Sequence, residues 1–327
     1  MKAIQLNKYG GPKNFEYVDL DIPKVQDKQV LIKIHCTTIN DYDWCMMRGN
    51  PFIYRLMFGL FKPKSKIAGM ELSGIVEKLG ANTSKFKVGD EVYGDISEFG
   101  FGTFAQYISI NENALRLKPN NMSFEDASSI PHASMLAYQG LIKLGQLNNN
   151  GNKKFTILIN GAGGGVGTIA LNIAKQYNTI VTGVDTDNKL ELMKAIGFDH
   201  TIDYKKVNFS AQRKTYDIIF DTKQTHSVLT ILKSLNTNGH YITVGGNLTR
   251  LFQTLLFKPV ISIFSKKRVS ILALKANVDL DKIEDMYTKG LIKPVIDGPY
   301  PLEKIAELIQ MFGEGKHNGK IVITVEH

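Results

Sequence analysis

The residues best suited to chemistry form a glycine-rich turn between an apolar run and a helix-like segment. Residues 157–167 read ILINGAGGGVG, so a buried-type run ends in five glycines within seven positions. This order suits a dinucleotide, because glycines let the backbone approach a pyrophosphate and the helix N-terminus offers N–H donors to its phosphates. The predicted phosphate contacts are Gly161, Gly163, Gly164, Gly165, Val166 and Gly167.

A carboxylate and an ammonium follow where the adenosine ribose of a dinucleotide is expected. Asp185 ends the next apolar run, about 20 residues after the glycine turn, where an acidic residue bonds the ribose hydroxyls. Asp185 favours NAD because it repels a 2′-phosphate, whereas Lys189 is near enough to pair with that phosphate and favours NADP. Lys189 can also be read as a solvated helix lysine, so these two residues alone leave the cofactor open.

Length, charge and cysteine content exclude several classes of protein. The 327 residues suggest about two domains, and 40 Lys and Arg against 31 Asp and Glu give a net charge of +9. The basic residues are spread along the chain, which argues against a nucleic-acid partner. Cys36 and Cys45 are too few for a disulfide framework or a four-cysteine zinc site.

Neither a targeting segment nor a membrane span is expected. The longest apolar stretch, 251–264, covers fourteen residues and contains Gln253, Lys258 and Pro259. A helical span needs about 20 apolar residues. We therefore expect a cytoplasmic protein.

The elements that must position these residues change in character along the chain. Short β-type runs with glycine punctuation fill the first 120 residues and suggest a β barrel or sandwich. Ser123 is a plausible N-cap of a helical region reaching Leu147, and 148–152 is a turn cluster. Strands and helices then alternate, which predicts a parallel sheet with helices on both faces. The expected strands are 30–34, 72–76, 91–93, 104–110, 155–160, 179–184, 200–203, 216–221, 239–244 and 320–325, and the expected helices are 167–177, 189–196, 227–235 and 302–312.

Several segments together resemble the medium-chain dehydrogenases/reductases over nearly the whole chain. Their order and spacing are more specific than any one of them. The segments are TINDYDW (38–44), GMELSG (69–74), FKVGDEVYG (86–94), GTFAQY (102–107), NGAGGGVGTIALNIAK (160–175), GFDHTIDY (197–204), VGG (244–246) and NGKIV (318–322).

The resemblance implies an α/β protein in which a Rossmann doubly wound parallel sheet is inserted into a GroES-like β-barrel catalytic domain. The barrel is expected to occupy 1–122 and to resume at 291–327, with the Rossmann domain at 123–290. The active site of such proteins lies in the cleft between the two domains.

The family contains zinc alcohol dehydrogenases and zinc-free reductases, and two positions favour the latter. Asn40 stands where the zinc enzymes carry their first cysteine, and Met70 stands where they carry a histidine. Neither side chain is a plausible zinc ligand. The nearest other candidates do not form an evident set, since His35 and Cys36 are adjacent on a strand and point to opposite faces. The other candidates are Cys45 and His132, and we predict no metal.

The zinc-free pattern resembles quinone-oxidoreductase-like proteins and enone reductases. It implies hydride transfer from NAD(P)H to a small-molecule quinone or to the β-carbon of an α,β-unsaturated carbonyl. Asn40 and Asp43 match the segment beside the nicotinamide, with Asn40 as a donor to substrate or cofactor and Asp43 acting electrostatically or tying down the loop. Tyr54 and Tyr42 are candidate proton donors; bulk water, with the tyrosines serving only in packing, is the alternative.

The resemblance also implies cofactor contacts outside the glycine turn. Tyr204 is expected beside the adenosine, Asp221 at a strand end, and Gly245 along the nicotinamide ribose. Asn318 and Lys320 are expected to close on the cofactor from the catalytic domain. The zinc-free relatives mostly use NADPH, so the resemblance implies NADPH in preference to NADH, although Asp185 makes this preference slight.

Two apolar inserts, 51–66 and 248–267, carry Arg or Lys near their ends. They are interpreted as walls of a pocket for a lipophilic acceptor, as a peripheral membrane contact, or as a packed lid or subunit interface. Monomer and homodimer both remain open. The competing functions are a zinc-type alcohol dehydrogenase and a non-enzymatic dinucleotide-binding protein on the same fold.

Overall fold

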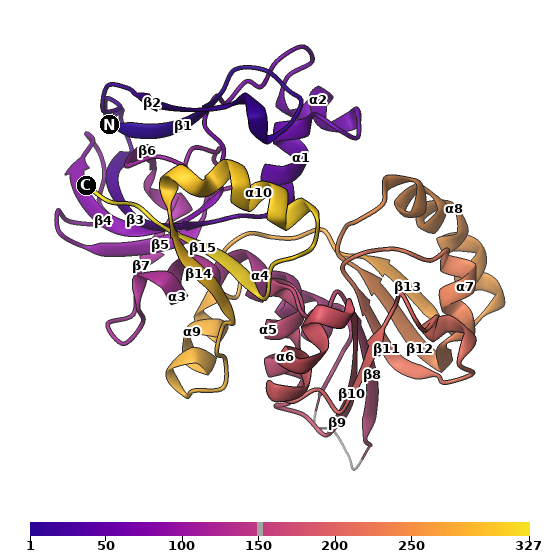
Figure 1. Ribbon diagram of the computed structural model, residues 1–327. Helices are drawn as coiled ribbons and strands as arrows, with labels where there is room; N and C mark the ends of the chain where they lie inside the picture. The colour runs from indigo at the N-terminus through magenta and orange to yellow at the C-terminus, as the bar shows by residue number, and fades with distance from the viewer. Residues whose placement is uncertain (149–152) are drawn as a thin grey trace. The chain divides into compact units, whose positions relative to one another are not determined.

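The computed structural model describes residues 1–148 and 153–327, which form two compact units (Figure 1). The first unit combines Met1–His132 with Ile296–His327, and the second is Ala133–Val295. Most of the predicted 148–152 turn lies outside the described residues.

The first unit is built on an antiparallel-rich barrel sheet with β3 at its centre. Its strand order is β14-β15-β3-β4-β5-β7, and β6 also pairs with β3. The strands are β3 (Gln29–Thr38), β4 (Glu71–Leu79), β5 (Glu91–Asp95), β6 (Tyr107–Asn111), β7 (Arg116–Leu117), β14 (Ile296–Pro301) and β15 (Lys320–Thr324), and a separate hairpin pairs β1 (Lys2–Leu6) with β2 (Phe15–Asp19).

Alternating apolar residues of these strands form the core of the first unit. Ile32 and Ile34 of β3 are completely buried with Leu72 of β4 and Ile323 of β15. The last strand therefore belongs to the same core as the first third of the chain. The helices of this unit are α1 (Asp41–Arg48), α2 (Ile53–Phe58), α3 (Phe124–Ser129) and α10 (Ile305–Gly313), with short 3-10 turns η1 (Pro12–Asn14), η2 (Glu112–Ala114) and η6 (Leu302–Lys304).

The second unit contains a sheet of six parallel strands in the order β10-β9-β8-β11-β12-β13. Numbered along this unit, the order is 3-2-1-4-5-6, that of a Rossmann sheet. The strands are β8 (Phe155–Asn160), β9 (Thr179–Asp185), β10 (His200–Asp203), β11 (Tyr216–Asp221), β12 (Leu235–Thr243) and β13 (Arg268–Ile271).

Helices flank this sheet at both ends. Figure 1 shows α5 and α6 beside β8, β9 and β10, and α7 and α8 beside β12 and β13. The helices are α4 (Pro131–Tyr138), which starts in the first unit, the π-helix η3 (Gln139–Leu144), α5 (Gly165–Ala174), α6 (Leu190–Ala195), α7 (Val228–Lys233), α8 (Leu248–Phe264) and α9 (Leu280–Thr288), with 3-10 turns η4 (Asp187–Lys189) and η5 (Phe209–Ala211). No helix in the described part of the chain is long and apolar enough to cross a membrane.

The strand order reverses between β8 and β11, and this point defines where a ligand binds such a sheet. Asn160 and Asp221 end these two strands in register. The Asn160 Nδ2 donates a hydrogen bond of 2.8 Å to the Asp221 Oδ1. In open α/β sheets, ligands bind outside the carboxyl ends of the strands at this reversal.

The predicted combination of a GroES-like barrel and a parallel Rossmann sheet is confirmed, with local differences. Residues 123–132 lie with the first unit, not with the Rossmann sheet, because α3 packs on β3, β4 and β15. The second unit ends at Val295 instead of 290. The strand β13 and the helices α8 and α9 were not predicted.

A glycine in the barrel gives the first testable prediction. A Cβ at Gly74 would lie 2.3 Å from the backbone oxygen of Lys33 on the paired strand. We expect Gly74→Ala to lower the free energy of unfolding by about 1–3 kcal/mol, because the strands must move apart. Urea unfolding measures this, and Lys78→Ala, exposed on the same strand, is the control. Equal stability of Gly74→Ala and wild type would contradict the packing argument.

Candidate functional site

A buried carboxylate, Glu71, organises a polar cluster in the first unit. Its Oε2 accepts hydrogen bonds from Thr38 Oγ1 at 2.7 Å and Asn40 Nδ2 at 2.9 Å. The same oxygen lies 2.5 Å from the Lys320 Nζ, and Oε1 accepts the backbone N–H of His132 at 2.6 Å. Glu71 is completely buried, so this ion pair and these donors compensate its charge in place of water.

Strand register brings the members of this Glu71 cluster together. In the antiparallel β3–β15 pair Val322 faces Thr38, which places Lys320 opposite Asn40 just beyond the last pair. The Lys320 Nζ donates to Asn40 Oδ1 at 2.5 Å. The β3–β4 pair, extended by one residue in the same way, brings Thr38 beside Glu71. Residues more than 240 positions apart thus share one buried site.

Asp43 fixes the backbone of the loop that carries Asn40. Its Oδ2 accepts the backbone N–H of Asn40 at 2.8 Å, and its Oδ1 accepts the backbone N–H of Gly69 at 2.8 Å. Asn40 and Asp43 form a capping box at the start of α1. Burial raises the pKa of Asp43 to about 7. Of the two predicted roles, tying down the loop agrees with this geometry.

His132 connects the cluster to a second buried acid. Its Nδ1 lies 2.8 Å from Asp95 Oδ2, and both side chains are buried. Burial opposes ionisation of Asp95, but the hydrogen bond and charge of His132 outweigh it and hold the Asp95 pKa below its usual value. The Tyr42 ring stands edge-on to the His132 ring, with the centroids 6.4 Å apart.

Tyr54 belongs to an aromatic layer formed by α1, α2 and the loop at Phe101. Its ring stacks on Phe58 with centroids 5.9 Å apart, and Phe58 also meets Tyr42 and Phe101 edge-on. Its hydroxyl hydrogen-bonds the Cys45 thiol, and burial raises the pKa of Tyr54. Within the described residues Tyr54 is not part of the Glu71 hydrogen-bond network.

In the second unit, the glycine turn has the close packing that its sequence predicted. Gly161 has a φ of +87°, which favours glycine. A Cβ on Gly167 would lie 2.3 Å from the Gly161 backbone oxygen, so only glycine lets α5 begin this close to β8. Residues 164–166 are partly exposed, and the first turn of α5 carries no acidic side chain. The free N–H groups of this turn therefore fit a phosphate.

Asp185 and Lys189 are both built into the base of this turn. Asp185 Oδ2 accepts the Gly163 N–H at 2.9 Å, and Oδ1 accepts the Thr186 N–H at 2.8 Å. The Lys189 Nζ lies 3.8 Å from Asp185 Oδ1, and Lys189 is buried. The interpretation of Lys189 as a solvated helix lysine is therefore wrong.

The buried Asp221 side chain accepts hydrogen bonds from the backbone of the loop after β11. Its Oδ1 accepts the backbone N–H groups of Lys223 and Gln224 besides the Asn160 amide, and its Oδ2 accepts the Tyr241 hydroxyl at 3.1 Å. The carboxylate is completely buried. These contacts assign Asp221 to holding the strand ends at the ligand-binding edge of the sheet.

The other predicted cofactor residues lie on two different units. Tyr204 follows β10, is 47% exposed, and donates its N–H to the Asp185 carbonyl. Gly245 follows β12 with a φ of +146°. Asn318 is exposed in the first unit and its N–H is held by Asp297 Oδ2 at 2.8 Å. Lys320, two residues later, points into the Glu71 cluster instead.

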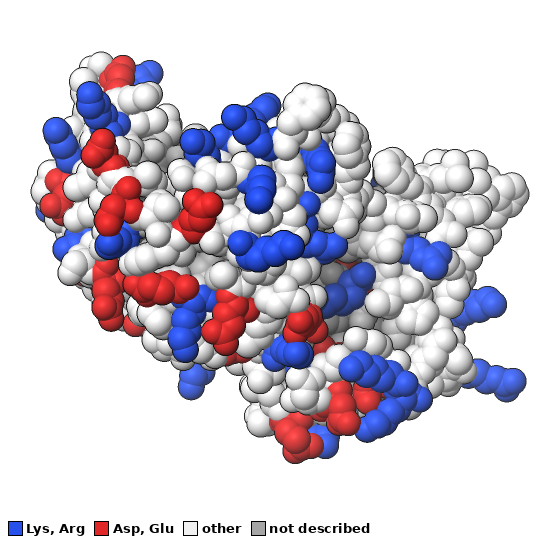
Figure 2. Space-filling view, turned by 45° about the horizontal axis from the view of Figure 1, so that its top comes forward, with Lys and Arg blue, Asp and Glu red and all other residues white. Residues whose placement is uncertain are grey.

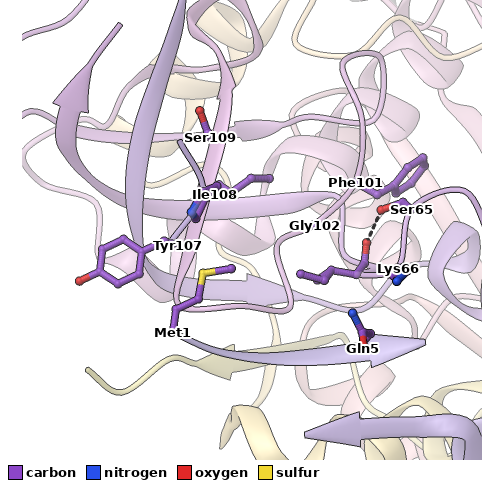
Figure 3. A pocket seen from close by; sticks show the side chains of 11 residues that line it. Met1, Gln5, Ser65, Lys66, Phe101, Gly102, Tyr107, Ile108 and Ser109 are labelled. Atoms are coloured by element: carbon purple, nitrogen blue, oxygen red, sulfur yellow. Dashed lines mark hydrogen bonds between the residues drawn. The ribbon is translucent and has the colours of Figure 1, made fainter. Parts of the chain in front are cut away.

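Sequence reasoning missed Glu71 and Thr38 as site residues. The signal was available, because Glu71 belongs to the GMELSG segment that carries the family resemblance and an acid in an apolar strand needs a partner. The pocket in Figure 3 lies elsewhere: it measures about 260 Å³ and is lined by residues such as Met1, Gln5 and Tyr107. None of the predicted site residues lines it.

Known proteins agree with this arrangement. A family model described as an alcohol dehydrogenase GroES-like domain matches 26–120, and one described as a zinc-binding dehydrogenase matches 196–323. The chain is 30% identical to a 2-methylene-furan-3-one reductase of Solanum lycopersicum, over 99% of this chain and 79% of that protein. This chain belongs to the medium-chain dehydrogenase/reductase superfamily.

Two further known proteins with quinone oxidoreductase in their names are similar to this chain. A chloroplast envelope quinone oxidoreductase homolog of Arabidopsis thaliana is 28% identical, over 99% of this chain and 98% of that protein. The solved quinone oxidoreductase of Coxiella burnetii shares the fold with a TM-score of 0.85 at 24% identity, covering 100% of this chain and 99% of that one.

The Glu71 cluster does not fit the catalytic zinc of other superfamily members. Both Glu71 oxygens are taken by hydrogen-bond donors and the Lys320 ammonium, so this carboxylate already has a cationic partner within the protein. Met70 is completely buried, and its thioether is not a zinc ligand. No group of three or more His, Cys, Asp or Glu suited to a metal occurs among the described residues. The zinc-free character stays a prediction, which metal analysis of the purified protein tests.

The raised pKa of Asp43 gives a prediction about stability and pH. Because the folded-state pKa of about 7 exceeds the unfolded value of about 3.9, the folded protein holds a proton that the unfolded chain releases. The contribution is fully present below the unfolded pKa and is lost as pH rises through the folded pKa. Wild type should therefore lose stability relative to Asp43→Asn by up to about 1.4 kcal/mol per pH unit in this window.

Urea unfolding of wild type and Asp43→Asn at pH 4, 5, 6 and 7 measures this difference. Asp21→Asn changes an exposed carboxylate of the same unit and is the control. Parallel stability curves for wild type and Asp43→Asn would show that Asp43 ionises normally in the fold.

Proposed function

We propose that this chain is a zinc-independent, NAD(P)H-dependent oxidoreductase that reduces a quinone or an α,β-unsaturated carbonyl compound. The observation that carries the proposal is the buried Lys320 ammonium, which Glu71 and Asn40 hold in the barrel unit. The same chain also contains a Rossmann unit. The names of the plant relatives support the acceptor class, since one acts on a methylene-furanone, an unsaturated ketone, and the other is a quinone oxidoreductase homolog.

The nicotinamide supplies the hydride when it is bound; the protein supplies position and charge. Reduction of an enone or quinone builds negative charge on the carbonyl oxygen, which preorganised donors stabilise. An ammonium has three N–H bonds, and Asn40 and Glu71 accept two of those of Lys320. We assign the third to the acceptor oxygen, and the proton that completes the reduction to solvent water.

Glu71 has two tasks in this scheme. Its carboxylate pairs with the buried Lys320 ammonium, and its hydrogen bond with Asn40 orients the amide beside that ammonium. Asp43 holds the Asn40 backbone from below. Lys320 is therefore the proposed catalytic residue, and Asn40, Glu71 and Asp43 are positioning residues.

An aromatic wall beside the cluster suits an acceptor with an apolar body. The Tyr42 ring contacts His132, whose N–H binds Glu71, and Tyr42 continues through Phe58 to Phe101. Flat conjugated molecules pack well on aromatic rings. Tyr54 belongs to this wall, so we assign it to packing against the acceptor instead of proton transfer.

For the cofactor we propose NADPH in preference to NADH. Asp185 favours NAD only if its negative charge repels a 2′-phosphate. The Lys189 ammonium, 3.8 Å from that carboxylate, compensates the charge and weakens the repulsion. The exposed Tyr204 ring beside them offers a surface for the adenine.

Two other functions, a zinc-type alcohol dehydrogenase and a non-enzymatic dinucleotide-binding protein, make different predictions in one assay. NADPH and NADH oxidation over a panel of quinones and enones, with metal analysis, separates them. Turnover without zinc supports the proposal, zinc-dependent alcohol oxidation supports the first alternative, and NADPH binding without turnover supports the second. The proposal includes a cytoplasmic monomer or homodimer, although the relatives include a chloroplast envelope and a mitochondrial protein.

Lys320 is the decisive residue to change. We expect Lys320→Met to lower kcat/KM for a quinone or enone about 100-fold or more, because it removes the donor to the developing oxyanion. Lys316→Met, at an exposed ion pair four residues away, is the matched control and should keep full activity.

The single variant leaves Glu71 buried without its cation and is expected to lose stability. The double variant Glu71→Gln with Lys320→Met removes both charges, so it leaves no unpaired buried charge and allows activity to be measured on a folded protein. Wild-type turnover by the folded double variant would refute the assignment of Lys320.

The cofactor proposal is tested by the ratio of kcat/KM for NADPH to that for NADH, because partial unfolding of a variant lowers both values equally. Lys189→Gln should lower the ratio of kcat/KM for NADPH to that for NADH about tenfold, the effect of losing one charge pair of about 1.4 kcal/mol. Lys194→Gln, in an exposed pair with Glu191 on the same helix, is the control. An unchanged ratio would separate Lys189 from cofactor choice.

A further inference from the structure

The helix α8 exposes a long apolar stripe. Its exposed apolar residues recur every three or four positions, and Leu256, Ile263 and Phe264 are 73%, 75% and 83% exposed. The stripe is Phe252, Leu255, Leu256, Pro259, Val260, Ile263 and Phe264. A continuous exposed patch of this kind marks an interaction surface, unlike scattered single residues.

The stripe is not the side by which α8 packs on its own unit. Thr254 and Ile261 are buried, and Phe257 packs on the same core between them. At 100° per residue these three side chains lie opposite Leu256 and Ile263. The helix is thus apolar on two faces, and the protein covers only one of them.

All the charged residues that flank the stripe in the sequence are Lys or Arg. Between Asp221 and Asp279 there is no acidic residue, whereas eight Lys or Arg occur. Arg250 and Lys258 lie on α8, and Lys266, Lys267 and Arg268 follow its end. Figure 2 shows an uncharged surface at the upper right of the view, where α8 lies, with Lys and Arg below it.

We propose that α8 docks this protein on an anionic lipid surface, lying in the interface with its stripe among the acyl chains. An exposed apolar face bordered by Lys and Arg is the pattern of interfacial helices. Its 17 residues make it about 26 Å long, enough for a firm contact parallel to the membrane. Anionic headgroups supply the negative charge that residues 222–278 lack.

Charge decides between a membrane and a second copy of the chain. Two copies meeting through α8 would bring their cationic borders together, and residues 222–278 contain no acid to pair them, which disfavours this association. A lipid surface provides both the apolar phase and the anions. The proposal is independent of the catalytic assignment, because α8 contains none of the proposed catalytic residues.

Co-sedimentation with vesicles tests the proposal. The full chain is mixed at 0.1 M salt with vesicles of phosphatidylcholine alone or with 30% phosphatidylserine. We expect binding to the anionic vesicles, at least tenfold weaker binding to the neutral ones, and loss of binding at 0.5 M salt. A triple variant Leu256→Ser, Ile263→Ser and Phe264→Ser should bind the anionic vesicles at least tenfold more weakly.

A second variant and a control isolate the two contributions. Lys258→Gln with Lys266→Gln should remove the preference for anionic vesicles, while Val88→Ser with Leu117→Ser, exposed apolar residues of the first unit, should bind like wild type. Melting temperatures confirm that each variant is folded. Absence of wild-type binding, equal binding to neutral vesicles, or a dimer in sedimentation velocity that the triple variant abolishes would each overturn the proposal.

Discussion

A buried ion pair between Glu71 and Lys320 is the constraint on which the candidate site depends. Taking a carboxylate and an ammonium out of water is unfavourable unless each is the partner of the other and their remaining positions are hydrogen-bonded. Thr38, Asn40 and the His132 backbone satisfy Glu71. The ion pair therefore requires that β3, β4 and β15 be paired in register before the site exists.

The Rossmann unit uses the same principle with a different outcome. Asp185 and Asp221 are buried carboxylates whose oxygens accept backbone N–H groups of the loops at the ligand-binding edge. They shape the loops that a dinucleotide would contact. Buried charge in both units thus orders the chain at the two candidate sites, at a cost in desolvation that the hydrogen bonds offset.

Local patterns predicted five of the six described strands of the Rossmann sheet, β8 to β12, because each of these strands is a contiguous apolar run. The glycine turn was identified at the residues that the structure packs closely, Gly161 and Gly167. Helix α8 was not predicted because its outward face is as apolar as its inward face. Its sequence therefore lacks the helical alternation of apolar and polar residues that would indicate a buried face. The first-unit position of 123–132 was missed because Ser123 looks like the start of a new region, although α3 packs back onto the barrel.

The sequence by itself determined the dinucleotide turn, the family and the departures at Asn40 and Met70 that argue against zinc. Those features depend on residue identity and short spacing. Only the tertiary structure decided that Lys320 meets Asn40 and Glu71, that Lys189 is buried beside Asp185, and that Asp43 serves the loop. The Lys320 contacts join distant segments, because strand register, which no local pattern encodes, brings a residue near the end of the chain to one near its beginning. Lys189 and Asp185 are only four positions apart, and Asp43 and Asn40 only three, so for these pairs the fold decides burial and side-chain orientation.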